Sequence, residues 1–421
     1  MRQVVSPGLL SGEVVIPPSK SDAQRALLLA ALTPGTSTIC EIGLSDDVRT
    51  MLKCIKVLGA ALEVQDNYIL VTGTTHFPAK ASFDCGESGL TFRLLSALCC
   101  LHEGEYEFDG SGSILDRSHG FIDDFGLKYG IEITSNDNRL PYFIRGGLDP
   151  NLDSIEVDGS ISSQFISGLL IGIPLLSRRI VLRAINLRSF PYVKMTLNTM
   201  KHFGVRVDLG MGNVFSFSND DPYQLTSYSV QKDWSAASYW IVAGAIGHQV
   251  SLKGLNISTD QADERILSVL TMVGATFLIN EDQLSFHSAG SIAFNFDATD
   301  CPDLFPALAT LALFCNGLSR IKGVHRLVNK ESDRSQVLLS QFQKIGAEIY
   351  FDGDEMCIDG LKALRFAKVS SHGDHRIAMC LAIAALQIEG GLQIEGALAV
   401  TKSYPDFWKD LEKLRPRKMG Q

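Results

Sequence analysis

The feature that most constrains this fold is an internal repeat. A helical pattern that ends at a glycine and is followed by two short alternating strands occurs five times. The glycines recur at nearly constant intervals, as Gly59, Gly130, Gly204, Gly274 and Gly346. Glycine fits the left-handed position that ends many helices. A constant period predicts repeated supersecondary units.

A second pattern interleaves with the first at the same period. It is an apolar helix, then a turn, then a short strand. The six predicted helices span residues 19–32, 87–101, 162–176, 233–246, 302–314 and 374–388, and their turns fall at Gly35, Gly104, Ser177, Gly247, Gly317 and Gly391. Helices apolar on all sides are expected to be buried, whereas the amphipathic helices 48–58, 192–203 and 332–345 are expected outside.

Together these patterns predict an α/β fold of six βαβαββ modules with buried parallel helices, three modules per domain. The sixth lacks its closing hairpin, because the chain stops soon after a helix at 407–414. We predict a first domain at 19–229 and a second at 1–18 plus 230–421, with hinge strands near 17–20 and 227–233. Strands at 4–5 and 12–16 are expected to complete the second domain. Chance similarity of ordinary α/β segments is disfavoured, because two independent patterns share one period.

Composition narrows the function classes. The net charge is −9, which argues against a general nucleic-acid or membrane-surface binder but not against an anionic small-molecule substrate. The nine cysteines are scattered without a CxxC pair, and the segment Met1–Pro18 contains no long apolar run, so we expect a cytoplasmic protein. Phosphate-loop, dinucleotide and Gly-x-Ser-x-Gly motifs are missing, and His372 with His375 lacks a third metal ligand.

Chemistry gathers at the starts of the buried helices and in the loops before the outer ones. The helix starts hold Ser19-Lys20-Ser21 with Arg25, Glu87-Ser88-Gly89 with Arg93, Ser162-Ser163-Gln164 and Asp374-His375-Arg376, and the loops hold Arg117, Ser189 with Tyr192, the run 330–334 and Lys402. Helix N-termini and cationic side chains bind anions. One such start alone would be ordinary capping, and one such loop would be solvated charge. Four such helix starts together favour a shared pocket that binds anions.

These residues resemble a known family. Lys20-Ser21 with Arg25, Ser162-Ser163-Gln164, the Lys-Glu-Ser-Asp-Arg run at 330–334, Asp374-His375-Arg376 and Lys402 are similar to the motifs of EPSP synthases (3-phosphoshikimate 1-carboxyvinyltransferases), in order and over the whole chain. The resemblance implies the enolpyruvyl transferase fold, an inside-out α/β barrel whose two domains close on two small anionic substrates. It implies transfer of the enolpyruvyl group of phosphoenolpyruvate to the 5-hydroxyl of shikimate 3-phosphate, by addition and then elimination of phosphate.

The resemblance also implies residue roles. Shikimate 3-phosphate would be held by Lys20, Ser21, Arg25, Ser162, Ser163, Gln164, Ser189, Tyr192, Asp303 and Lys330. Phosphoenolpyruvate would be held by Lys20, Gly89, Arg117, Gln164, Arg334, Arg376 and Lys402. Asp303 would take the 5-hydroxyl proton, and Glu331, with Lys20, would protonate the methylene carbon. No cofactor, metal, nucleic acid or membrane is implied, and we expect a monomer that rests open and closes on shikimate 3-phosphate.

Three positions depart from the family pattern. Leu90 and Leu94 stand where threonine and proline are common, beside Gly89 on the phosphoenolpyruvate side. We therefore expect reduced sensitivity to glyphosate, which competes there in the family. Arg326 stands where an asparagine contacting the shikimate ligand is common, so that contact is left open.

Two alternative functions share parts of this pattern. The sister enzyme, UDP-N-acetylglucosamine enolpyruvyl transferase, would carry a reactive cysteine near residues 111–114, and none is there. A catalytically inactive phosphometabolite-binding protein would not need Asp303, Glu331 and Lys20 together.

Overall fold

The computed structural model describes residues 1–416 except 75, 161, 177 and 218–222. The chain forms two compact units, Pro18–Gln231 and Met1–Pro17 with Lys232–Gln421. The chain thus passes from one unit to the other at residues 17–18 and again at 231–232, within the segments expected to act as hinge strands.

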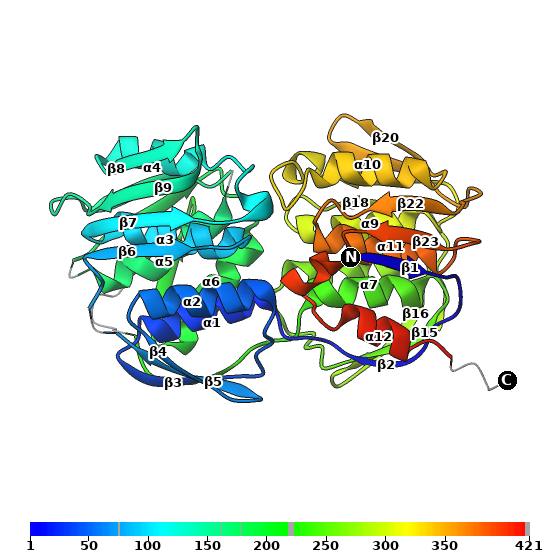
Figure 1. Ribbon diagram of the computed structural model, residues 1–421, viewed down its shortest axis with the longest axis horizontal. Coiled ribbons are helices and arrows are strands. Elements are labelled where there is room, and N and C mark those ends of the chain that lie inside the picture. The colour runs from blue at the N-terminus through cyan, green and yellow to red at the C-terminus, as the bar shows by residue number, and fades with distance from the viewer. Residues whose placement is uncertain (75, 161, 177, 218–222, 417–421) are drawn as a thin grey trace. The chain divides into compact units, whose positions relative to one another are not determined.

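The described part of the unit Pro18–Gln231 contains three four-stranded sheets (Figure 1). Their strand orders are β14(Ser227–Ser229)-β3(Gly35–Cys40)-β5(Tyr68–Gly73)-β4(Ala61–Val64), β6(Lys80–Asp84)-β7(Gly104–Asp109)-β9(Arg139–Gly146)-β8(Glu132–Asn136) and β10(Ser154–Asp158)-β11(Val181–Ile185)-β13(Val214–Phe217)-β12(Val207–Gly210). In each sheet the first two strands are parallel and the other pairs antiparallel. This is the strand pattern of one βαβαββ module.

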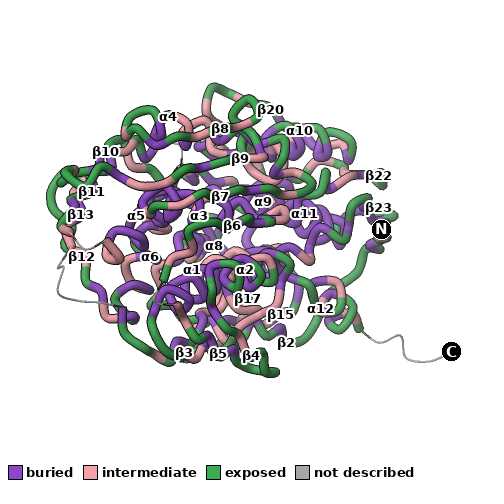
Figure 2. The backbone as a smooth tube through the Cα atoms, turned by 60° about the vertical axis from the view of Figure 1, so that its left-hand side comes forward, coloured by how far each residue is buried: buried purple, intermediate pink, exposed green. Residues whose placement is uncertain are grey.

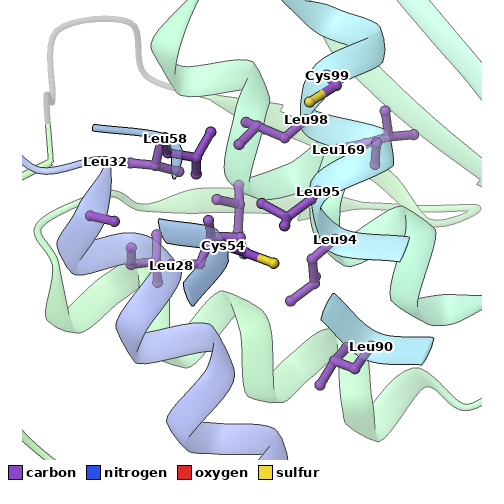
Figure 3. Packing of buried hydrophobic residues seen from close by; sticks show 14 of the residues in the cluster. Leu28, Leu32, Cys54, Leu58, Leu90, Leu94, Leu95, Leu98, Cys99 and Leu169 are labelled. Carbon is purple, nitrogen blue, oxygen red and sulfur yellow. The ribbon is translucent and has the colours of Figure 1, made fainter. Parts of the chain in front are cut away.

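The helices of this unit separate into buried and outer ones. The buried helices are α1(Lys20–Ala31), α3(Gly89–Leu101) and α5(Ser163–Gly172), and the outer ones are α2(Asp46–Val57), α4(Gly120–Tyr129) and α6(Phe190–His202). Short 3-10 turns lie at Gly112–Ile114 and Ile173–Leu175. Figure 2 shows the tube of α3 and α5 largely in the buried colour. Figure 3 shows the packing that results, with Leu28, Leu95 and Leu169 of the three buried helices in one cluster.

The other unit repeats the plan. Its sheets are β2(Ser11–Val15)-β15(Gln249–Lys253)-β17(Gln283–Ser288)-β16(Thr276–Asn280), β18(Asn295–Asp297)-β19(Leu318–Lys322)-β21(Glu355–Asp359)-β20(Glu348–Asp352) and β1(Arg2–Val5)-β23(Leu392–Glu395)-β22(Ala367–Ser370). The buried helices are α7(Trp234–Ala245), α9(Phe305–Ala312) and α11(His375–Ala385), and the outer ones are α8(Ile266–Met272), α10(Arg334–Lys344) and α12(Phe407–Lys413). 3-10 turns lie at Ala262–Arg265, Pro302–Leu304, Val324–Arg326 and Ala397–Lys402.

The predicted fold class is confirmed, and the opening segment joins the sheets of the second unit. β2 pairs in parallel with β15, and β1 pairs with β23 in place of the hairpin that the sixth module lacks. The parallel pairing of β14 with β3, which completes the first sheet, was not predicted. The predicted turn at Ser177 lies outside the described residues. Among the residues that are described, no helix is long and apolar enough to cross a membrane.

The two chain crossings run beside each other and are tied to the start of α1. Ser19 N donates to Gln231 O at 2.7 Å, and Asp233 N donates to Pro17 O at 2.9 Å. The buried carboxylate of Asp22 accepts from Gln231 N at 2.9 Å and from the Tyr228 hydroxyl at 2.6 Å. The first turn of α1, which carries Lys20 and Ser21, is therefore fixed to the second crossing segment.

Two kinds of glycine maintain the repeat. The five predicted helix-ending glycines all have positive φ, from +67° at Gly130 to +108° at Gly59. A second kind was not predicted. A Cβ on Gly73, Gly146 or Gly360 would lie 2.0, 1.8 or 2.1 Å from a carbonyl oxygen of Thr33, Cys99 or Cys315. At these places a hairpin strand crosses the C-terminal end of a buried helix too closely for any side chain.

We therefore expect Gly360→Ala to lower the free energy of unfolding by about 3 kcal/mol, because the strand must move away from α9. The three tryptophans, at 234, 240 and 408, all belong to the unit that contains Gly360, so their fluorescence in urea reports that unit alone. Gly353→Ala is the control: it has φ +59° and nothing within 4 Å of the added Cβ, so only backbone strain of about 1 kcal/mol is expected. Equal losses in the two variants would contradict the steric account.

Candidate active site

In the unit Pro18–Gln231, the start of α1 carries a partly buried lysine and a buried arginine. Lys20 Nζ lies 2.8 Å from Asp47 Oδ2, with the two side chains only 11% and 9% exposed. Arg25 donates from Nε to Thr196 Oγ1 at 2.7 Å, from Nη1 to Ser21 O at 2.8 Å and from Nη2 to Tyr192 O at 3.3 Å. Arg25 thus ties Ser21 on α1 to Tyr192 on α6. Burial lowers the pKa of Arg25 to about 10, and the guanidinium stays charged at neutral pH.

The start of α3 carries a second cationic cluster. Arg117 Nη2 donates to Ser113 Oγ at 2.8 Å, and its Nε is buried without a hydrogen-bond partner in the part of the chain described. A Cβ on Gly89 would lie 2.9 Å from Arg117 Nη1. The guanidinium can therefore lie against this helix N-terminus because residue 89 has no side chain.

The start of α5 joins this cluster through an amide. Gln164 Oε1 accepts from Arg93 Nη1 at 2.8 Å, which links α5 to α3. Ser162 caps the helix by accepting from Phe165 N, and Ser163 is 7% exposed. Ser189, which precedes α6, has φ +54° and is 2% exposed. Of the sequence-predicted residues in this unit, Arg25 contacts Ser21 and Tyr192, while Gly89 lies against Arg117.

In the other unit, Asp303 is the centre of a charge network. Its Oδ1 accepts from Arg334 Nη1 at 2.8 Å and lies 3.6 Å from Lys330 Nζ. Its Oδ2 accepts from Arg376 Nη2 at 2.9 Å. Burial alone would raise the pKa of Asp303, but Arg376, Lys330 and Arg334 outweigh it and hold the pKa far below its usual range. Asp303 is therefore ionised and paired on both oxygens.

Arg334 connects Asp303 to two further carboxylates. This guanidinium is 1% exposed, and it donates from Nε to Asp374 Oδ2 at 2.8 Å and from Nη2 to Glu331 Oε2. Asp374 also caps α11 by accepting from Arg376 N at 2.9 Å. Lys402 Nζ donates to Gly373 O at 2.6 Å, one residue before that cap. These contacts bring together six candidates from the sequence within this unit: Asp303, Lys330, Glu331, Arg334, Arg376 and Lys402.

Asp374 itself was not assigned a role from sequence. In this motif only Arg376 has a predicted role, while Asp374 positions both Arg334 and the first turn of α11. An aspartate at a helix N-cap followed by an arginine two residues later was the available signal. His375 is 1% exposed.

The family model for EPSP synthase (3-phosphoshikimate 1-carboxyvinyltransferase) matches residues 4–411. The chain belongs to the EPSP synthase family. Curated relatives named 3-phosphoshikimate 1-carboxyvinyltransferase include those of Clostridium novyi, 34% identical over 422 residues, and Clostridium acetobutylicum, 35% identical over 419; each alignment covers 97% of this chain and 96% of the relative.

Solved structures share the fold at lower identity. The EPSP synthase of Acinetobacter baumannii superposes with a TM-score of 0.78 at 23% identity, covering 98% of each chain. The enolpyruvyl transferase NikO of Streptomyces tendae gives 0.77 at 16% identity, covering 98% of this chain and 97% of that one. These likenesses confirm the enolpyruvyl transferase fold expected for an EPSP synthase family member.

Within this EPSP synthase family member, Lys330 has an unusually low pKa. Burial lowers its pKa to about 8, although the neighbouring Asp303 partly offsets the effect. Lys330 thus loses its proton more easily than Arg334 and Arg376, whose pKa values are raised by the carboxylates around them.

The buried position of Asp374 predicts a large effect on stability. Asp374→Ala would leave Arg334 buried without its Nε acceptor, so we expect a loss of about 3 kcal/mol in unfolding free energy, measured by tryptophan fluorescence in urea. Asp352→Ala is the matched control, because Asp352 pairs with Arg320 at 2.8 Å but is 61% exposed, and a change below about 0.5 kcal/mol is expected. A small effect at Asp374 would contradict the structural role given to it.

Proposed function

We propose that this chain transfers the enolpyruvyl group of phosphoenolpyruvate to the 5-hydroxyl of shikimate 3-phosphate and releases phosphate. Membership of the EPSP synthase family over residues 4–411 is the observation that carries the proposal. The buried Asp303–Arg334–Asp374 network supports it, because it supplies cations and carboxylates for a reaction that binds anions and moves protons.

Shikimate 3-phosphate is the substrate proposed for the α1, α5 and α6 starts. Lys20, Ser21, Ser162, Ser163 and Gln164 would supply ammonium, hydroxyl, amide and backbone donors to the phosphate and ring hydroxyls. Arg25 would act chiefly by fixing Ser21 and Tyr192, since its three donor nitrogens already bond to protein oxygens. Ser189 and Tyr192, with Asp303 and Lys330 from the other unit, complete the proposed set.

Phosphoenolpyruvate carries a phosphate and a carboxylate, so it requires several cations. Arg117, Arg334, Arg376 and Lys402, with Lys20, Gln164 and the Gly89 backbone, are the proposed donors. Arg117 and Arg376 each retain a buried Nε without a hydrogen-bond partner in the described residues, which supports their having donor capacity to spare. All three nitrogens of Arg334 donate to carboxylates, which would fix its orientation toward a substrate.

Asp303 is the proposed acceptor of the 5-hydroxyl proton, and Glu331, with Lys20, the proposed donor to the methylene carbon. A carboxylate clamped by Arg334 and Arg376 is a weak base. When an anionic substrate engages those guanidiniums, part of their hold on Asp303 is lost and its basicity rises. In the addition step the alcohol oxygen bonds to the central carbon of phosphoenolpyruvate as its proton passes to Asp303 and another reaches the methylene. Elimination then removes a proton from the methyl group formed in the first step, expels phosphate and restores the double bond.

We further propose that the protein works in the cytoplasm as a monomer. All nine cysteines are free and eight of them are buried, which supports a reducing compartment.

Phosphate release in the presence of both substrates tests the function and the roles. The wild type is expected to release phosphate only when shikimate 3-phosphate and phosphoenolpyruvate are both present. Lys20→Ala and Arg117→Ala are expected to lower kcat/KM at least about a hundredfold, because each removes a cation from a binding site for anions. Lys128→Ala, which removes an exposed partner of Glu156, is the control with near-wild-type rates expected.

Phosphate release only with UDP-N-acetylglucosamine as the acceptor would identify the sister activity. The lack of phosphate release with either acceptor would identify an inactive binding protein. Near-normal turnover in Lys20→Ala or Arg117→Ala would break the assignment of that residue.

We also expect weak inhibition by glyphosate. Leu90 and Leu94 lie inside α3, 5% and 0% exposed, so their bulk contributes to how the helix that begins at Gly89 is seated. The half-inhibitory concentration should exceed that of a sensitive family member by about tenfold or more when both are assayed at equal ratios of phosphoenolpyruvate to KM. Inhibition as tight as in the sensitive enzyme would show that these leucines do not matter.

A further inference from the structure

A buried carboxyl group that the proposed roles leave out lies in the same unit as Asp303. Asp263 belongs to the 3-10 turn Ala262–Arg265, and the residues before it are clamped to the start of α7. Gln261 Oε1 accepts from Trp234 N at 3.0 Å, and Gln261 Nε2 donates to Lys232 O at 2.7 Å. The backbone that carries Asp263 is therefore held in one place beside the first turn of α7.

The carboxyl group of Asp263 is poorly compensated for an anion. The residue is 3% exposed. Its Oδ2 accepts a hydrogen bond from the Ser235 hydroxyl. Its Oδ1 is buried and has no hydrogen-bond partner in the described chain. A buried carboxylate with a single neutral donor is costly, whereas a neutral carboxylic acid in the same place is not.

The charged groups around Asp263 lead to the same conclusion. Asp303 from the turn before α9 and Asp233 at the cap of α7 disfavour a negative charge on Asp263, whereas Arg376 from α11 and the Ser235 hydroxyl favour one. Burial keeps the neighbouring thiol of Cys301 protonated and therefore uncharged. Arg376 is already engaged by Asp303 Oδ2 at 2.9 Å, and Arg265 lies 3.8 Å from Cys301 Sγ. Burial first, and then repulsion from Asp303, raise the pKa of Asp263 to about 7.

We propose that Asp263 is a positioning residue for Asp303: it holds a proton in the working enzyme, so that Asp303 carries the single negative charge of the pair and keeps Arg376. The role in catalysis rests on the proposed function, whereas the charge state of the pair does not. Asp303 needs to be the ionised member because it is the one in contact with Arg334, Arg376 and Lys330.

The charge on Asp263 is expected to make the binding of phosphoenolpyruvate depend on pH. As pH rises through about 7, Asp263 loses its proton and a second carboxylate competes for Arg376. Arg376 then binds an anionic substrate less well, so the KM for phosphoenolpyruvate rises on the alkaline side. Asparagine has the shape of a protonated aspartate and cannot ionise, so Asp263→Asn fixes the pair in its proposed working state.

The test compares the KM for phosphoenolpyruvate below and above pH 7 in the wild type, Asp263→Asn and Asp300→Asn. Asp300 is an exposed carboxylate shortly before Asp303 in the chain, so its removal serves as the control. We expect the KM of the wild type and of Asp300→Asn to rise by about tenfold for one pKa unit of coupling, and that of Asp263→Asn to change far less. The same alkaline rise in all three proteins would overturn the proposal, because the titrating group would then lie elsewhere.

A second measurement needs no substrate. Infrared difference spectra of the wild type against pH should show a protonated carboxylic acid that disappears as pH rises through about 7. The band should be missing from Asp263→Asn. A wild-type spectrum without it overturns the proposal even where the variant fails to fold. An enzyme that shows the band but transfers nothing to shikimate 3-phosphate would instead overturn the proposed function and leave the charge state of Asp263 established.

Discussion

Burying the guanidinium of Arg334 is the constraint from which the arrangement of its unit's polar residues follows. A charge that is 1% exposed must be met by acceptors at each nitrogen, and the chain brings them from three places: Asp303 before α9, Glu331 before α10 and Asp374 at the cap of α11. These carboxylates in turn recruit Arg376 and Lys330. The result is a network in which Asp303 and Glu331, the proposed catalytic groups of this unit, are each held by at least one partner of opposite charge. Such a network fixes geometry more than it adds stability, because much of its Coulomb energy offsets the cost of removing the charges from water.

The repeat explains why side chains from separate parts of the chain can meet in one network. Each module brings the start of one buried helix and the loop before one outer helix to equivalent places. The same backbone requirement recurs in three of the modules, as the close strand-to-helix crossings at Gly73, Gly146 and Gly360 show. The side chains at those helix starts are free to differ, from Ser19-Lys20 on α1 to Asp374 on α11. One scaffold thus supplies dissimilar chemistry at repeated positions.

How far the sequence predicted this structure depends on the range of the interaction involved. Signals local to the chain were reliable: helix-ending glycines, apolar helices and the polar starts of those helices. Contacts between distant segments were not. The pairing of β14 with β3 joins strands from opposite ends of the unit Pro18–Gln231, and no local pattern announces it. Arg25 shows the same limit, since no local pattern predicts that its guanidinium donates to Thr196, Ser21 and Tyr192. Asp263 carries no motif at all, and its environment comes from three other segments.

The two carboxyl groups that interact with Arg376, those of Asp303 and Asp263, have pKa values shifted in opposite directions. Asp303 has a depressed pKa because cations surround it, and Asp263 has a raised one because burial and Asp303 oppose its ionisation. Environments that push two neighbouring carboxyl groups apart in pKa separate an acid from a base at one pH. This difference between the two pKa values depends on the ion pair between Arg376 and Asp303. An anionic substrate that draws Arg376 away would bring the two pKa values closer, raising that of Asp303 at the moment when it has to accept a proton. Substrate binding would then itself supply the basicity that the resting, fully paired Asp303 lacks.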